Sequence, residues 1–281
     1  MILLAIATPR PENRAFLLLR RLWALALRHV YLHIGSWPRI LEMLYWPIIN
    51  MLMWSFASVY VTRQFGVTSS AGISASLIAG ALLNELSMRV SINSLMLFLE
   101  EVWSRNLGHL FASPLKISEY AVGLITVSLT RTCIALIPAI LLAKFMFGFW
   151  LFSLGMPALV FIALLAMNGC WYGLLIVSLP LRFGLAAEWL AWMSSWLLIP
   201  FMAPYYPVAI LPPFLRPIAH ALPASHVFEA MRALIDHGEW QGHELLTALG
   251  LNILYLILAA LVLRLSWLAA RKEGRLLENS E

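Results

Sequence analysis

Long apolar runs recur along this chain of 281 residues, and they constrain its fold more than any other feature. A helix of about 20 apolar residues is long enough to cross a hydrocarbon core of about 30 Å. Hydrophobic residues make up 62% of the sequence and charged residues only 12%, which is about half the share usual in soluble domains. We therefore predict an all-α polytopic membrane protein.

The runs predict six spans within residues 40–268 of a single transmembrane domain, residues 1–281. The predicted spans are residues 40–61, 73–99, 119–143, 151–179, 185–203 and 245–268. The preceding segment, residues 12–36, carries arginines seven positions apart, which form a basic stripe on an apolar helix. We predict that this helix lies in the headgroup layer. The alternative is a first span with buried arginines, each of which would cost roughly 2.5–3.5 kcal/mol.

The distribution of basic residues predicts the orientation. A cytoplasmic N-terminus places thirteen lysines and arginines inside and four outside, and leaves Arg89 and Arg131 within spans. Both termini and residues 100–116 are then cytoplasmic, and the twelve tryptophans serve mostly as anchors at the membrane interfaces. The net charge of +5 is thus explained by membrane topology, without nucleic-acid binding.

A proline-rich segment, residues 204–243, separates the fifth and sixth predicted spans. We call it the outer segment. It is too apolar for a free loop and too often interrupted by proline for a span. We predict short re-entrant or interfacial helices at the outer leaflet, covered by protein. The last of them should be capped by Ser225 and end at Gly238.

Ionisable residues inside predicted spans are the main candidates for function. Glu85 and Arg89 are four residues apart in the second span, so they share a helix face and can form an ion pair. Asn93 follows on the same stripe, and Arg131 in the third span could also pair with Glu85. Such a row should face a helix interface or a hydrated pathway. Two interpretations remain open: a purely structural ion pair, or the polar lining of a translocation path.

The residues needed for most enzymatic chemistry are missing. Asp236 is the only aspartate, and none of the three lysines ends a glycine-rich phosphate loop. The histidines match no metal-ligand spacing, and Cys133 and Cys170 lie inside apolar runs. We predict no catalytic residue, no metal site and no cofactor in this chain.

Two stretches, "EEVWSRNLGHLFASPLKISEYAVG" and "YYPVAILPPFLRPIAHALPASHVFEAMR", resemble the ABC-2 type membrane subunit of bacterial ABC exporters. The resemblance covers nearly the whole chain. It implies that residues 100–116 form a cytoplasmic coupling helix, which docks on a separate ATPase subunit. One departure concerns the outer segment, where Met202-Ala203-Pro204 stands in the place of a Ser-Gly that many members carry before Tyr-Pro.

The resemblance also implies which residues would contact the ATPase. A helix that begins near Glu100 has acidic residues at its positive end. An apolar face at i, i+3 and i+4 would then fit a groove of the partner. The implied coupling residues are Glu100, Glu101, Trp103, Arg105, Leu107, Leu110 and Phe111.

We therefore predict the membrane subunit of an ATP-driven exporter in the bacterial inner membrane. Two ATPase subunits would bind ATP and magnesium, and a second copy of this chain or a homologous permease would complete the complex. The cargo would be amphipathic, lipid-linked, a polysaccharide or drug-like. Two other classes stay open: a secondary carrier driven by an ion gradient with Glu85 as the protonatable group, and a membrane-embedded transferase.

Overall fold

The computed structural model describes residues 37–65, 67–108 and 116–273. Within these ranges the chain forms helices joined by turns and contains no strand, which confirms the all-α prediction. The long helices are α2 (Trp37–Phe65), α3 (Val67–Trp103), α5 (Ile117–Phe147), α6 (Met156–Phe183) and α11 (Gly242–Lys272). The short ones are η1 (Leu151–Leu154), η2 (Leu185–Ala187), α7 (Glu188–Leu197), α8 (Ile199–Met202), η3 (Val208–Ile210), α9 (Arg216–Ala221) and α10 (Pro223–His237). The predicted interfacial helix 12–36 lies outside the described residues.

Five segments of the described chain are long and apolar enough to cross a membrane. They are Ile40–Gln64, Ile117–Phe147, Met156–Phe183, Leu185–Met202 and Gly242–Lys272. The predicted span 73–99 is not among them, although it lies entirely within α3. Serines, asparagines and an ion pair lower the hydropathy of α3.

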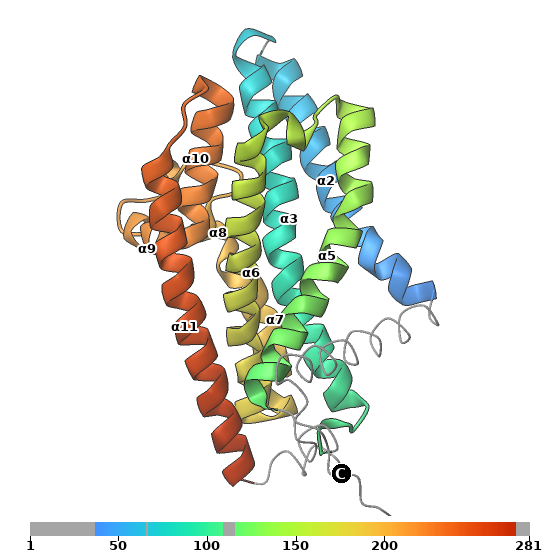
Figure 1. Cartoon of the computed structure of the whole chain (residues 1–281). Helices are drawn as coiled ribbons and strands as arrows, with labels where there is room; N and C mark the ends of the chain where they lie inside the picture. Colours follow the sequence, from blue (N-terminus) through green and yellow to red (C-terminus); the bar gives the residue numbers. More distant parts are fainter. Residues whose placement is uncertain (1–36, 66, 109–115, 274–281) are drawn as a thin grey trace, which may run out of the picture.

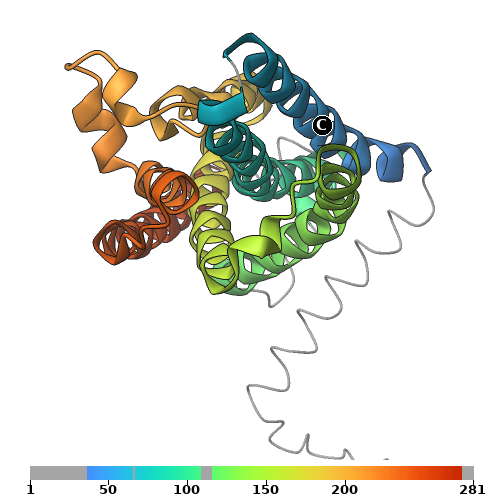
Figure 2. The same cartoon turned by 90° about the horizontal axis from the view of Figure 1, so that it is seen from above.

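The burial of α3 explains its polarity. Every residue from 78 to 99 is buried except Arg89 and Met96, which are half-buried. Helices α2, α5 and α6 pack directly on α3, which therefore occupies the centre of the bundle (Figures 1 and 2). A helix enclosed by protein does not need the apolar surface that lipid demands of its neighbours.

A close contact joins α3 to α6 through two glycines. A Cβ at Gly169 would lie 2.6 Å from the carbonyl oxygen of Ser87, and one at Gly173 would lie 2.8 Å from the Ser94 hydroxyl. Asn168 donates a hydrogen bond of 2.9 Å across the same seam to the Ser87 hydroxyl. Small residues that let two backbones approach, with polar groups bonded across the contact, are typical of helix pairs in membranes.

The proline-rich segment folds as short helices along one side of the upper half of the bundle in Figure 1. The last of them, α10, ends at Gly238 as predicted, and this glycine adopts a left-handed φ of 71°. The predicted N-cap was wrong, because Leu222 occupies that position and Pro223 takes the first helical turn. Ser225 instead donates from inside the helix to the carbonyls of Ala219 and Leu222.

Candidate functional site

Two adjoining cavities lie between α2, α3 and α7, with volumes of about 330 and 430 Å³. They share four lining residues: Trp46, Arg89, Ile92 and Trp196. We call the two cavities together the polar groove. All four predicted path residues line it: Glu85, Arg89, Asn93 and Arg131. The structure thus brings together in one hollow residues that the sequence could place only on two separate spans.

A buried ion pair forms the centre of the polar groove. The carboxylate of Glu85 accepts from Nε of Arg89 at 2.5 Å and from Nδ2 of Asn50 at 2.7 Å. Its ion pair is therefore with Arg89, four residues along α3, and not with Arg131. Asn50 was not predicted from the sequence, although an asparagine in a mostly apolar span is a signal that could have drawn attention to it.

The upper end of the polar groove joins α3 to the outer segment. Asn84 donates to the hydroxyl of Tyr205 at 3.3 Å, and the Tyr205 ring stacks on Trp54 with centroids 3.6 Å apart. Burial raises the pKa of Tyr205 to about 12, so its phenol stays neutral at physiological pH. Gly80 permits this contact, because a Cβ there would lie 2.3 Å from the carbonyl oxygen of Pro204.

One polar atom at this end has no partner among the described residues. The side chain of Asn84 is 2% exposed, and its amide oxygen accepts no hydrogen bond. A buried acceptor without a partner is costly unless water or a ligand supplies a donor. Asn93 differs, because its amide donates to the Thr132 hydroxyl at 3.0 Å and so helps to join α3 to α5.

Exposed aromatic and apolar side chains flank the polar groove. Trp46 is 47% exposed and Trp196 is 56% exposed, while both line the cavities. The neighbouring faces of α2 and α7 carry further large exposed side chains: Tyr45, Met53, Phe56, Tyr60, Trp189 and Met193. Most tryptophans were predicted to anchor the chain at the membrane interfaces. The structure instead places four of them along the polar groove: Trp46, Trp54, Trp192 and Trp196.

The charged stretch after α3 differs from its predicted shape. Glu100, Glu101 and Trp103 belong to the end of α3, so no separate helix begins there. The chain turns at Arg105, which has a left-handed φ of 55°, and becomes helical again at Leu107. The predicted helix start was wrong because α3 continues without a break through the acidic pair.

The residues available for docking also differ from the prediction. Leu107 is only 3% exposed and packs in the main core cluster with α3, α5 and α6. Trp103 is 51% exposed, and its indole N–H points to Glu188 at 3.4 Å. Leu110 and Phe111 lie outside the described residues. Within the described part, Trp103 and not Leu107 is the large apolar side chain available to a partner.

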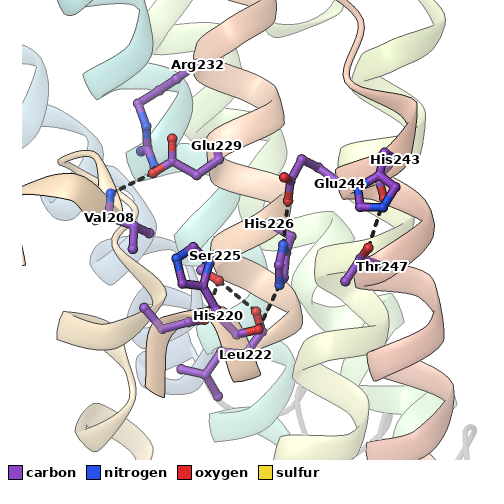
Figure 3. A network of polar contacts seen from close by, with 11 residues as sticks. Val208, His220, Leu222, Ser225, His226, Glu229, Arg232, His243, Glu244 and Thr247 are labelled. Carbon is purple, nitrogen blue, oxygen red and sulfur yellow. Dashed lines mark hydrogen bonds and ion pairs between the residues drawn. The ribbon is translucent and has the colours of Figure 1, made fainter. Parts of the chain in front are cut away.

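Two side chains of α10, Glu229 and Arg232, hold residues 203–208 against this helix (Figure 3). One oxygen of Glu229 accepts from the Val208 backbone N–H at 2.6 Å and from Arg232 at 3.0 Å. Arg232 also donates to the carbonyl of Ala203 at 3.0 Å. Ala203 has a left-handed φ of 52°, the region that favours glycine.

The histidines of the outer segment take part in a second network. Nδ1 of His226 lies 2.5 Å from a Glu244 oxygen, and Nε2 lies 2.8 Å from the carbonyl oxygen of His220 (Figure 3). No group of three or more histidine, cysteine or acidic side chains that could hold a metal occurs in the described ranges.

The family model of the ABC-2 type transporter matches residues 20–235. This chain belongs to the ABC-2 type transporter family. The matched residues include α2, α3, α7 and the whole polar groove. No individual curated protein matched the chain at a significant level.

Membership of the ABC-2 family makes this chain a multi-pass membrane subunit of an ABC transporter. It is a transport permease without an ATPase motif of its own, and such permeases work with an ABC ATPase subunit, typically as dimers. The resemblance drawn from the two quoted stretches is therefore confirmed.

Proposed function

We propose that this chain exports an amphipathic or lipid-linked molecule across the bacterial inner membrane, driven by a separate ATPase. The observation that supports this most is the polar groove, where a buried ion pair lies beside exposed aromatic side chains on one face. Charged and polar residues at membrane depth are otherwise expensive, and their position in a hollow suits a path for a cargo with both polar and apolar parts.

In this proposal α3 is the sixth membrane-spanning helix. Its 37 residues would extend about 55 Å, which exceeds the hydrocarbon thickness of about 30 Å. The neighbouring spans cover it on its lipid side, so its serines and asparagines never meet acyl chains. The outer segment would then lie at the exit side, re-entering the outer leaflet against α3 and α10.

A second copy of the chain, or a homologous permease, would close the polar groove. The groove opens between α2 and α7, and both helices carry large exposed apolar side chains beside it. Two such faces opposite each other would enclose a common path lined by aromatic rings, with an ion pair from each copy. Closed symmetric dimers are the usual solution for one self-complementary face.

Both termini and the turn after α3 would face the cytoplasm, as the distribution of basic residues indicates. The two ATPase subunits would bind ATP and magnesium, and this chain would bind neither. Trp103 and Arg105 at the end of α3 would meet the ATPase, so that its closure moves the helix that lines the polar groove. Leu107 would brace this turn against the core instead of docking.

Purification of the tagged chain from its native membrane, together with any ABC ATPase that binds it, tests the proposal. We expect a stable complex with two copies of each subunit, which light scattering can establish from the mass. We also expect the complex to hydrolyse ATP and vanadate to inhibit this hydrolysis. Transport in membrane vesicles should stop with vanadate and continue with a protonophore. Transport by the chain alone that a protonophore abolishes would contradict the proposal and favour the secondary carrier.

A further inference from the structure

Besides the polar groove, the described part of the chain has an apolar hollow on another face, between α6, α7 and α11. Its volume is about 820 Å³. We call it the apolar groove. On α6 it follows one face from Trp171 to Phe183, and on α11 it follows Val262, Leu265 and Ala269. Nothing in the proposed transport path uses it.

The interior of the apolar groove presents almost no free polar group. The Trp171 indole donates to Asn252 at 3.0 Å, and the Tyr172 hydroxyl donates to the carbonyl of Ser194. The Ser178 and Ser194 hydroxyls donate to carbonyls of their own helices, each at 2.7 Å. A ligand in this interior would therefore meet mostly apolar surface, which suits a chain of methylene groups.

One end of the apolar groove is charged. Arg182 lines it one residue before the end of α6, is 38% exposed, and forms an ion pair of 3.3 Å with Glu273. Arg271 and Lys272 in the last turn of α11 are also exposed. The last turn of α11 thus adds two exposed cations next to the Arg182–Glu273 ion pair, and positive charge at this end of the groove suits an anion.

The length of the apolar groove matches one leaflet of a bilayer. From Trp171 to Phe183, α6 rises about 18 Å. Half of a hydrocarbon core of about 30 Å is about 15 Å. A lipid whose phosphate lies at Arg182 would thus extend its acyl chain along the groove and end near the middle of the membrane.

We propose that the apolar groove binds an anionic phospholipid of the inner leaflet, with its phosphate at Arg182 and one acyl chain along α6 and α11. The leaflet rests on the cytoplasmic orientation given under the proposed function, but lipid binding itself does not require transport or an ATPase. Such a lipid would hold α7, which forms one wall of the polar groove, against α6 and α11.

Native mass spectrometry of the purified chain tests this with palmitoyl-oleoyl phosphatidylglycerol and with phosphatidylcholine of the same chains. We expect phosphatidylglycerol to be retained more strongly. Arg182→Gln should lower its retention about fivefold, since one cation near the headgroups contributes about that factor. Glu273→Gln should raise retention, because it removes the competing carboxylate. Arg264→Gln, an exposed cation of α11 outside the groove, should change nothing.

A second pair of variants tests the acyl chain. Ala269→Trp should fill the apolar groove and abolish retention of both lipids, whereas Ala260→Trp on an exposed part of α11 should not. Equal retention of the two lipids by the wild type, or unchanged retention in Ala269→Trp, would overturn the proposal. So would a wild-type chain that retains no lipid, the outcome expected if residues 1–36 or a second copy fill the groove. A lipid-free chain that still forms an active complex would leave the exporter function intact.

Discussion

Ala203 illustrates how a single residue limits the outer segment. It ends α8 in a left-handed conformation at φ 52°, and its carbonyl accepts from Arg232. A Cβ in this region costs roughly 1–2 kcal/mol. We expect Ala203→Gly to raise the thermal midpoint in detergent by the equivalent of about 1 kcal/mol.

The matched change Ala260→Gly, on an exposed position of α11, should lower stability by about 1 kcal/mol, because glycine is the poorer helix former. The two alanines should thus respond with opposite signs. If Ala203→Gly destabilises as much as Ala260→Gly does, the left-handed conformation at Ala203 is refuted.

The buried ion pair of Glu85 and Arg89 can be tested by single variants and by a charge swap. Either Glu85→Gln or Arg89→Gln should cost about 3–5 kcal/mol in unfolding free energy, because each leaves a buried charge without its partner. Combining Glu85→Arg with Arg89→Glu should recover most of the thermal stability. Export in a strain that lacks the chain should nevertheless stay lost, because the swap moves the carboxylate one turn away from Asn50. Restored export would mean that the pair is structural.

The seam of α3 and α6 sets the packing at the scale of elements. We expect Gly169→Ala and Gly173→Ala each to lower stability by about 1–3 kcal/mol, since their Cβ atoms would overlap α3. Gly250→Ala on α11 is the control, because nothing lies within 4 Å of its Cβ position. Thermal unfolding of the three variants in detergent checks this. Equal midpoints for all three would show that the seam is looser than the structure has it.

Two residues at the turn after α3 have different predicted roles: Leu107 packs in the core, and Trp103 contacts the ATPase. Leu107→Asp should destabilise the chain by about 3 kcal/mol or more, because it places a charge among buried apolar residues. Trp103→Asp should leave the thermal midpoint within about 0.5 kcal/mol of the wild type, since Trp103 is exposed. In the complex, Trp103→Asp should uncouple ATP hydrolysis from export. Full export by Trp103→Asp would remove Trp103 from the coupling surface.

The sequence predicted elements where one physical rule decides their form. Apolar length locates α2, α5, α6 and α11, and Gly238 ends α10 because it tolerates a left-handed φ. It failed where tertiary contacts decide. The end of α3 at Trp103 depends on the packing of the following turn. The residues around Glu100 carry no local signal that shows whether α3 continues there or a new helix begins.

The same limit applies to the candidate site. Helical spacing alone paired Glu85 with Arg89. The hollow that joins them to Asn50, Trp196 and Tyr205 depends on how three helices and the outer segment meet, which no spacing along one helix reveals. At the same time the broad class followed from composition and two short stretches, because a membrane restricts the possible folds more than water does.

At the scale of the whole molecule, one buried helix is surrounded by apolar ones. Helix α3 runs from the cytoplasmic turn, past the polar groove, to the contact of Gly80 with the outer segment in the proposed orientation. A movement of its cytoplasmic end would therefore reach both the path and the exit. The apolar groove lies on the other side of α7, where a lipid would limit that movement.

In the proposed mechanism the polar groove changes its accessibility with the ATP cycle. Met53→Cys in a variant without Cys133 and Cys170 puts a reporter in the groove, and Ile257→Cys puts one of similar exposure on α11. In the complex with the ATPase, labelling of Met53→Cys by fluorescein maleimide should change several-fold between the nucleotide-free and vanadate-trapped states. Labelling of Ile257→Cys should not change. Equal labelling rates at Met53→Cys in both states would show that the accessibility of the polar groove does not change with the ATP cycle.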